Sequence, residues 1–272
     1  MRYLLRNIYH NRGLIKDFVY RDFKSKFAGS TLGTVWNVIH PLVMIAIYVL
    51  IFSQVMRAKL PGSRPSQYSY SVYLCAAILP WGLFNELLIR YTNLFFEHAN
   101  LIKKVSFPRP ILHISAMVTG TINFLISFTI FVIFLGFLIL TNRFTIRIPF
   151  PSILIFFAVL GLQQIFCLGL GLAFSVLNVF FRDVGQLVNI LSLLWFWFTP
   201  IVYVIAVVPE KLQRLLKMNP LYYFMSIYRS ILYRGDNPEL KDIVIVVIFS
   251  LLSFIAGAFI YKRLADEVPD EI

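Results

Sequence analysis

The chain has 272 residues, of which 59% are hydrophobic and only 14% are charged, and its formal net charge is +12. Soluble domains carry about a quarter charged residues, so this composition excludes an ordinary water-soluble domain and indicates a membrane protein. The positive charge does not indicate a nucleic-acid-binding protein, because the lysines and arginines lie in short segments between apolar runs, as expected beside an anionic membrane surface.

The N-terminal tail, residues 1–34, precedes the first apolar run. It has no uninterrupted apolar stretch with a small-residue cleavage site, so we expect no cleavable signal peptide. Within it, Leu14–Phe27 places apolar side chains four positions apart and basic side chains on much of the remaining surface. This pattern predicts an amphipathic helix in the lipid headgroup region, either as a membrane anchor, as a platform that also contacts a cytoplasmic partner, or as both.

Six apolar segments follow, each long enough to cross a ~30 Å hydrocarbon core, which takes about 20 helical residues. They are Val35–Val55, Val72–Leu94, Ile111–Leu140, Pro151–Val179, Val184–Val207 and Ile243–Tyr261. The predicted fold class is an all-α integral membrane protein with a six-span domain, residues 35–261, and a C-terminal tail, residues 262–272. No repeat at a fixed period is present, which disfavours an inverted-repeat transporter.

The distribution of basic residues predicts that both termini are cytoplasmic. The N-terminal tail carries seven lysines and arginines, whereas the loop after the first span carries three. Six more basic residues lie in the loop between the last two spans, but this loop is long, and long loops count less for orientation. Because six is even, the two termini lie on the same side of the membrane. Residues 99–112 and the short FFRDVG turn between spans four and five are predicted to lie on that cytoplasmic side as well.

The loop between spans two and three reads ANLIKKVSFPRPIL and is predicted to contain a short helix at Asn100–Lys104. Its apolar surface comes from Leu101 and Ile102, and its charge comes from two lysines. Pro108 and Pro110 end the helix sharply. A positively charged topology anchor would explain the lysines but not the prolines, so we expect a stiff projecting helix that transmits force.

Other ionisable groups have ordinary explanations. Glu86 and Arg90 lie four residues apart within a span, and we expect them to neutralise each other on one helix face. His40 and His113 begin spans and are expected at the membrane interface rather than as ligands. Cys75 and Cys167 lie within or beside apolar runs and are interpreted as small packing residues rather than a disulfide.

Motifs for nucleotide binding or catalysis are absent from the sequence. Gly29–Thr34, GSTLGT, lacks the lysine of a phosphate-binding loop, and the pattern G-x-x-x-x-G-K-[ST] occurs nowhere, so the chain cannot bind ATP in that way. No Cys, His and carboxylate cluster has metal-ligand spacing. No pair of carboxylates is placed for acid–base chemistry.

Two segments near the C-terminus, Leu194–Tyr203 and Asn219–Tyr233, are dense in aromatic residues. Interfacial belts of Trp and Tyr are common in membrane proteins and explain any single ring. Their flat faces and polar edges could also stack on a sugar ring. Between them, the stretch after Pro209 is too polar to span and too apolar for a free loop, which predicts short re-entrant or interfacial helices.

Four segments in this order resemble the permease subunits of type-2 ABC exporters, and especially the branch that contains O-antigen, capsule and teichoic acid permeases. They read RDFKSKFAGSTLGTVWNVIHPL, ANLIKKVSFPRPILHIS, NVFFRDVGQLVNILSLLWFWFTPIVY and NPLYYFMSIYRSIL. The resemblance covers essentially the whole chain. Glu86 and Arg90 match no motif of the family.

The resemblance implies a homodimer that works with two copies of a separate ATPase subunit, which binds ATP and Mg, so that this chain carries no cofactor. It implies an interface helix with the residues Phe18, Arg21, Phe23, Lys24 and Phe27. It implies an ATPase-coupling segment with the residues Asn100, Leu101, Ile102, Lys103, Lys104, Phe107 and Arg109. Gate helices at Pro209–Tyr233 and a glycan channel would involve Trp195, Trp197, Tyr203, Tyr222, Tyr223 and Tyr228.

The function implied is ATP-driven export of a polyprenyl-diphosphate-linked polysaccharide across the bacterial cytoplasmic (inner) membrane, with no covalent chemistry in this chain. O-antigen is favoured, and teichoic acid and capsular polysaccharide are alternatives. Two other classes remain open. A membrane enzyme acting on a polyprenyl-linked sugar is disfavoured by the few, scattered carboxylates, and an ion channel or structural scaffold would be excluded by dependence on nucleotide.

Overall fold

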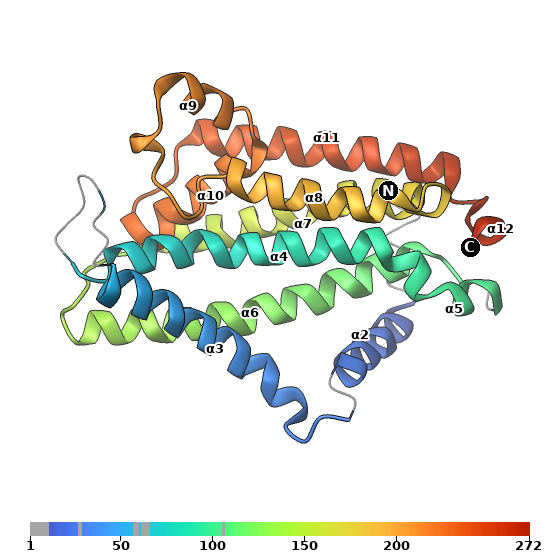
Figure 1. Cartoon of the computed structure of the whole chain (residues 1–272), viewed down its shortest axis with the longest axis horizontal. Coiled ribbons are helices and arrows are strands. Elements are labelled where there is room, and N and C mark those ends of the chain that lie inside the picture. Colours follow the sequence, from blue (N-terminus) through green and yellow to red (C-terminus); the bar gives the residue numbers. More distant parts are fainter. Residues whose placement is uncertain (1–10, 27–28, 57–59, 61–65, 105–106) are drawn as a thin grey trace.

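The computed structural model describes residues 11–26, 29–56, 60, 66–104 and 107–272. Within these ranges the chain forms helices and no β-strands, which confirms the predicted all-helical class. Five helices run side by side along the long axis of the molecule (Figure 1). They are α4 (Ser69–Glu97), α6 (Pro110–Leu140), α7 (Phe150–Phe180), α8 (Asp183–Phe198) and α11 (Leu240–Leu264).

The first apolar run forms a composite helix that crosses this bundle obliquely (Figure 1). It comprises a 3₁₀ turn η1 (Gly33–Val35), helix α3 (Trp36–Val49) and a π-helical segment η2 (Leu50–Val55). Short helices lie at both ends of the bundle. One end has α2 (Arg12–Lys26), α5 (Ala99–Lys104) and α12 (Val268–Glu271), and the other has η3 (Ile205–Val207), α9 (Glu210–Leu216), α10 (Pro220–Arg229) and η4 (Ser230–Arg234).

Five of the six predicted spans are helices long and apolar enough to cross a membrane. The remaining one, predicted as Val184–Val207, is wrong in length, because α8 has only 16 residues and ends at Phe198. Its length of about 24 Å falls short of a full hydrocarbon core. The helix ends there because Pro200 has no amide hydrogen and disfavours helical backbone at Thr199, whose ψ is 124°.

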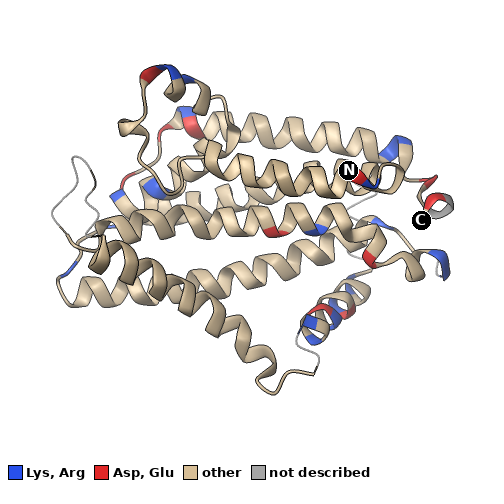
Figure 2. Ribbon diagram, in the orientation of Figure 1, with Lys and Arg blue, Asp and Glu red and all other residues tan. Residues whose placement is uncertain are grey.

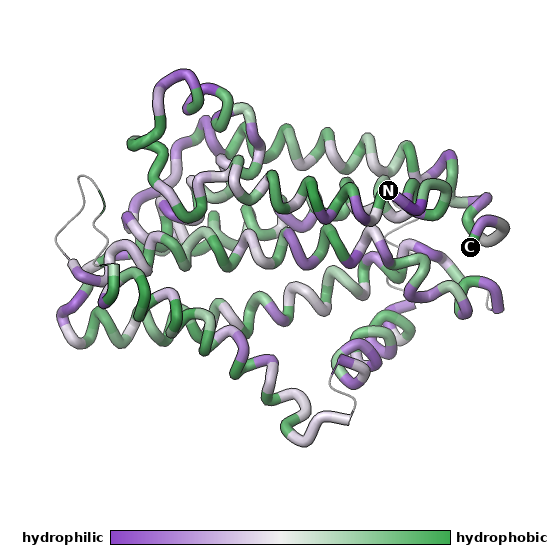
Figure 3. Tube along the Cα trace, viewed as in Figure 1, coloured by the Kyte–Doolittle hydropathy of each residue, from purple (hydrophilic) through white to green (hydrophobic). Residues whose placement is uncertain are grey.

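Charge and hydropathy are arranged along the bundle as a membrane would require. Figure 2 shows most Lys, Arg, Asp and Glu residues on α2 and near the two ends of the bundle. Figure 3 shows hydrophobic residues along the lengths of the long helices. The long axis of the bundle is therefore the direction in which the chain crosses the membrane.

The core lies where α4 and α7 meet, with α6 and α11 packed on either side. Its largest fully buried side chains include Phe84, Tyr91 and Phe95 of α4. Cys75 and Cys167 are buried free thiols in the same core, which confirms that they are packing residues. This core fixes the helices relative to one another and therefore determines which side chains lie at each end of the bundle.

Helices α7 and α11 make backbone contact through small residues. A Cβ atom on Gly257 of α11 would collide with the backbone of Gly169, and one on Gly169 would collide with the backbone of Ser253. Glycine at both positions lets the two helix backbones approach without side chains between them, which is a common basis of helix packing in membranes.

We expect Gly257→Ala to destabilise the chain by about 1–3 kcal/mol, because the added methyl group overpacks the α7–α11 contact. Thermal unfolding of the purified protein in detergent would show a lower midpoint. Gly161→Ala on α7 is the matched control, since nothing lies within 4 Å of its added Cβ. Equal midpoints for the two variants would contradict this role of Gly257.

Candidate functional site

Helix α2 occupies the position of the predicted amphipathic helix and packs against α6. Its Phe18 is buried, with its ring 5.9 Å from that of His98 and 6.1 Å from that of Phe107. Phe23 is half-buried, whereas Arg21 and Lys24 are exposed. Phe27 lies outside the described residues. The helix thus presents basic side chains on its outer surface, and its role stays a prediction.

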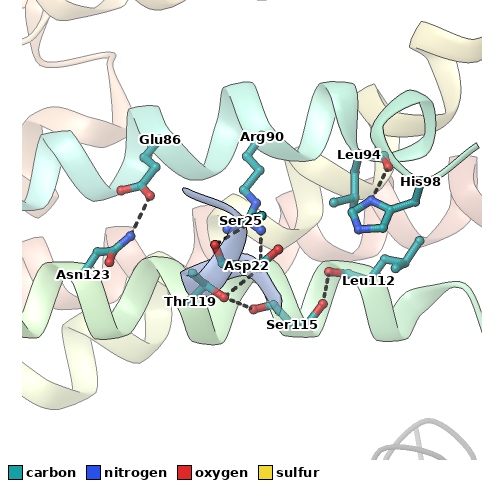
Figure 4. A network of polar contacts seen from close by, with 10 residues as sticks. All are labelled: Asp22, Ser25, Glu86, Arg90, Leu94, His98, Leu112, Ser115, Thr119 and Asn123. Atoms are coloured by element: carbon teal, nitrogen blue, oxygen red, sulfur yellow. Dashed lines mark hydrogen bonds and ion pairs between the residues drawn. The ribbon is translucent and has the colours of Figure 1, made fainter. Parts of the chain in front are cut away.

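A polar network ties α2 to the bundle (Figure 4). Asp22 of α2 forms an ion pair with Arg90 of α4 and accepts a hydrogen bond of 3.0 Å from the Thr119 hydroxyl of α6. The Asp22 and Arg90 side chains are each 19% exposed, so water screens the pair only in part. One carboxylate therefore links three helices.

The expected neutralisation of Glu86 by Arg90 is wrong. Arg90 pairs with Asp22, and Glu86 instead accepts a hydrogen bond of 3.1 Å from the amide of Asn123 (Figure 4). Spacing along one helix cannot reveal this pairing, because Asp22 precedes Arg90 by 68 residues and lies on a different helix.

His113 lies in the first turn of α6 and faces the interior of the bundle, so its expected depth at the membrane interface stays a prediction. Its side chain is fully buried within the bundle, its Nε2 lies 2.9 Å from the Ser175 hydroxyl, and its ring packs edge-on against Phe95 and Tyr261. His40, by contrast, is exposed.

Helix α5 projects from the end of α4 and has one face inward and one outward. Ile102 is buried and Leu101 is half-buried, whereas Asn100, Lys103 and Lys104 are exposed. The structure therefore has the short helix predicted for Asn100–Lys104, extended by one residue at its start. Two adjacent lysines form its outer, charged surface.

The segment after α5 is fixed at two points. Phe107 packs against Phe18 of α2, and the Arg109 guanidinium donates a hydrogen bond to the backbone oxygen of Ala265 at the end of α11. Pro110 then starts α6, at a position where the missing amide hydrogen has no cost. A displacement of α5 would thus be felt by α2 and α11 as well as by α4 and α6.

A polar cavity of about 680 Å³ adjoins α5 and reaches the turn between α7 and α8. Lys103 and Arg182 line it together with several amide side chains. Asn178 closes its inner side, donating to the backbone oxygen of Thr92 and accepting from the backbone amide of Gly185. Sequence reasoning missed Arg182, although it placed this turn on the same side of the membrane as α5.

The aromatic residues predicted for a channel differ in burial and in hydrogen-bond partners. Trp197 is exposed, whereas Trp195 is half-buried and donates a hydrogen bond of 2.8 Å to the side chain of Asn219. Tyr228 is fully buried, and its hydroxyl donates a hydrogen bond of 2.9 Å to Gln163. Tyr203 is half-buried and donates to the backbone oxygen of Trp197.

The remaining two rings, Tyr222 and Tyr223, lie edge to face at 5.2 Å near the start of α10. Burial, followed by the nearby Asp242 carboxylate, raises the pKa of both phenols above its usual value. Both hydroxyls therefore stay protonated at neutral pH and can donate hydrogen bonds.

Arg229, at the end of α10, holds the turn that follows α8. Its guanidinium donates hydrogen bonds of 2.6 and 2.7 Å to the backbone oxygens of Pro200 and Ile201, and it lies 3.7 Å from the centre of the Tyr73 ring. Burial lowers the pKa of Arg229 to about 10, so it is still charged at neutral pH. Sequence reasoning did not single out this residue.

Residues 14–233 match the sequence model of the family described as ABC-2 type transporter. The chain belongs to this family. The match begins in α2 and ends in η4, so it includes α5, the α7–α8 turn and Arg229. The resemblance to type-2 ABC exporters drawn from the four motifs is thereby confirmed.

Named relatives of this ABC-2 transporter cover nearly its whole length. The O-antigen export system permease protein RfbA of Myxococcus xanthus is 28% identical over 99% of both chains. A protein of the same name from Klebsiella pneumoniae is 30% identical over 94% of this chain and 95% of its own. The polysialic acid transport protein KpsM of Escherichia coli is more distant, at 19% identity over 89% of this chain and 90% of its own.

Proposed function

We propose that the chain is the permease subunit of an exporter that moves a polyprenyl-diphosphate-linked polysaccharide, O-antigen in the first place, across the bacterial inner membrane. The observation that carries this proposal is the end-to-end similarity to two permeases named for O-antigen export. The weaker similarity to a polysialic acid transport protein makes capsular polysaccharide the second candidate.

In this proposal the chain forms a homodimer and works with two copies of an ATPase subunit that binds ATP and Mg. The exposed Lys103 and Lys104 would be seated on that subunit, with Arg182 beside them across the polar cavity. The fixed points at Phe107 and Arg109 support the idea that movement of α5 is passed to the bundle rather than absorbed by a loose loop.

The proposed topology has six crossings and cytoplasmic termini. The short α8 would complete the fifth crossing together with the turn that Arg229 holds, and α9 and α10 would form gate helices on the outer side. The grouping of α2, α5 and α12 at one end of the bundle supports a shared side for both termini (Figure 1).

Deletion of the gene tests the proposal. We expect loss of long-chain polysaccharide from the cell surface on a gel, with lipid-linked glycan accumulating in the cytoplasmic leaflet, and restoration by the plasmid-borne gene. An intact ladder would exclude export of this polysaccharide. Absence of the glycan without accumulation would instead favour an enzyme of its synthesis.

We expect Asp22→Asn to reduce export several-fold while lowering stability by roughly 1–3 kcal/mol, because it leaves the guanidinium of Arg90, in a side chain only 19% exposed, without its charged partner. Removing the charge loosens α2 from α4 without unfolding the bundle. Complementation of the deletion strain and thermal unfolding of the purified variant measure the two effects. Asp17→Asn, an exposed position of the same helix, is the control, and equal export by both variants would argue against a role for the network.

A further inference from the structure

A groove lies between α3 and the helices α4 and α6 of the bundle. It consists of two adjoining cavities of about 420 and 440 Å³, each within the size range of ligand-binding sites. Five residues line both cavities, so the cavities form one continuous space, which we call the α3 groove. These residues are His40, Pro41, Glu86, Asn123 and Ser127.

The polar end of the α3 groove lies one helical turn from the ion pair of Asp22 with Arg90. Lys26, four residues after Asp22 on α2, lines the cavity at this end, and so does Glu86, four residues before Arg90 on α4. In Figure 4, Glu86 and Arg90 both extend from α4 toward α6. The polar end therefore lies beside α2, the helix that we expect among the lipid headgroups.

The two walls of this polar end carry complementary groups. The wall formed by α4 and α6 has the Glu86 carboxylate and the Ser127 hydroxyl. The Asn123 amide donates to Oε1 of Glu86 at 3.1 Å, and because a carboxylate accepts several hydrogen bonds, Glu86 can also accept from a ligand. The opposite wall, formed by α2 and α3, has side chains that can donate to a phosphate: Lys26, Trp36, Asn37 and His40.

Beyond this end the α3 groove is largely apolar. Met44 and Tyr48 line it from α3, on the same helix face as His40. The apolar residues that line it from the bundle include Ile78, Leu79, Phe124 and Phe196. Polarity thus changes along the groove as it does along a lipid, from a charged head beside α2 to a hydrocarbon chain between α3 and α4.

The charges of the groove select among lipids. A carboxylate in a membrane-crossing helix is costly and usually functional, and Glu86 favours a ligand with a cationic donor. A diphosphate carries more negative charge than a single phosphate and would be repelled by Glu86, so the lipid-linked substrate proposed above is not the ligand that fits here. Phosphatidylglycerol has a phosphate but no cation, whereas the ammonium group of phosphatidylethanolamine has three N–H donors.

We propose that the α3 groove binds phosphatidylethanolamine. The phosphate accepts hydrogen bonds from Lys26 and the donors of α3, the ammonium group donates to Glu86, and one acyl chain lies along Met44 and Tyr48. The bound lipid fills the space between α3 and the bundle. This inference goes beyond the proposed function and does not depend on which molecule is exported.

The test uses the purified full chain in nanodiscs of phosphatidylcholine and a phosphatidylethanolamine with a photoreactive diazirine near the start of one acyl chain. We expect cross-links to peptides that contain residues 40–48 and 78–86. Unlabelled phosphatidylethanolamine should suppress them at about tenfold lower content than phosphatidylglycerol with the same acyl chains, as expected from one hydrogen bond to a charged group. Equal suppression by the two lipids, or cross-links spread evenly over the exposed faces of α8 and α11, would overturn the inference.

Variants give a second measurement, with photoreactive phosphatidylethanolamine and phosphatidylglycerol compared on each. Glu86→Gln should reduce labelling by phosphatidylethanolamine about tenfold and leave labelling by phosphatidylglycerol unchanged. Lys26→Gln should reduce labelling by both lipids, because both carry the phosphate. Glu97→Gln on α4 and Lys16→Gln on α2, at exposed positions of the same helices, are the controls and should label as the unsubstituted chain does. Unchanged labelling of Glu86→Gln by phosphatidylethanolamine would contradict the role of Glu86.

The same competition distinguishes a membrane lipid from the substrate. If a polyprenyl diphosphate suppresses the cross-links at lower content than phosphatidylethanolamine does, the α3 groove is a substrate site and our assignment is wrong. If it suppresses them less, the assignment to phosphatidylethanolamine holds. The competition on the unsubstituted chain decides even if a groove variant does not fold, and it is independent of the export measured in the deletion strain.

Discussion

Replacement of both Lys103 and Lys104 by Glu should abolish polysaccharide export while leaving the permease folded and able to form the proposed homodimer. The two side chains are exposed on the outer surface of α5 and contribute nothing to the core, so stability should hardly change. If this surface contacts the ATPase subunit as proposed, reversing its two charges removes electrostatic complementarity and introduces repulsion. Surface polysaccharide in the complemented deletion strain, and co-purification of the ATPase subunit, are the measurements.

Lys262→Glu with Arg263→Glu is the matched control, because it reverses two adjacent exposed charges at the same end of the bundle, on α11. We expect normal export from this variant. If the α5 variant also exports normally, α5 does not couple the permease to its ATPase. If both variants fail, the defect lies in the overall charge of this end rather than in α5.

Arg229→Met should destabilise the chain by roughly 2–5 kcal/mol, because it leaves the backbone oxygens of Pro200 and Ile201 buried without donors. The loss also removes the contact with the Tyr73 ring. Arg229→Lys should recover only part of the lost stability, since a single ammonium lacks the planar pair of donors that reaches two oxygens at once. Thermal unfolding in detergent measures both variants.

Arg234→Met tests whether any arginine at this end matters equally. Arg234 is exposed, so its replacement should shift the unfolding midpoint little. Limited proteolysis gives an independent reading, because the turn after α8 should be cleaved sooner in Arg229→Met alone. Equal stability of Arg229→Met and the unsubstituted chain would mean that the turn holds itself in place.

The apolar runs predicted the long helices well because their signal is local. A stretch such as Ile111–Leu140 is long enough and apolar enough to predict a membrane-spanning helix directly. In the structure this helix begins only one residue earlier, at Pro110. The amphipathic spacing of Leu14–Phe27 likewise marked α2, and the prolines after Lys104 marked the end of α5. In α8 the apolar signal continues past Phe198, but Pro200 ends the helix in spite of it.

Contacts between distant segments could not be predicted in the same way. Nothing in the spacing of Glu86 and Arg90 shows that Asp22 takes the arginine, or that Asn123 takes the glutamate. The value of Arg229 depends on two carbonyl groups some thirty residues earlier in the chain. The roles of the aromatic residues also depend on their surroundings, which bury Tyr228 and expose Trp197.

The glycine contact between α7 and α11 bears on how such a protein can change shape. Two helices whose backbones touch at Gly169 and Gly257 have no flexible side chains there on which to slide. We therefore expect the pair to move as one rigid body through a transport cycle. We expect the opening and closing of the transport path to involve movement of α3 and the short α8 instead. Each of these two helices presents a largely exposed apolar surface.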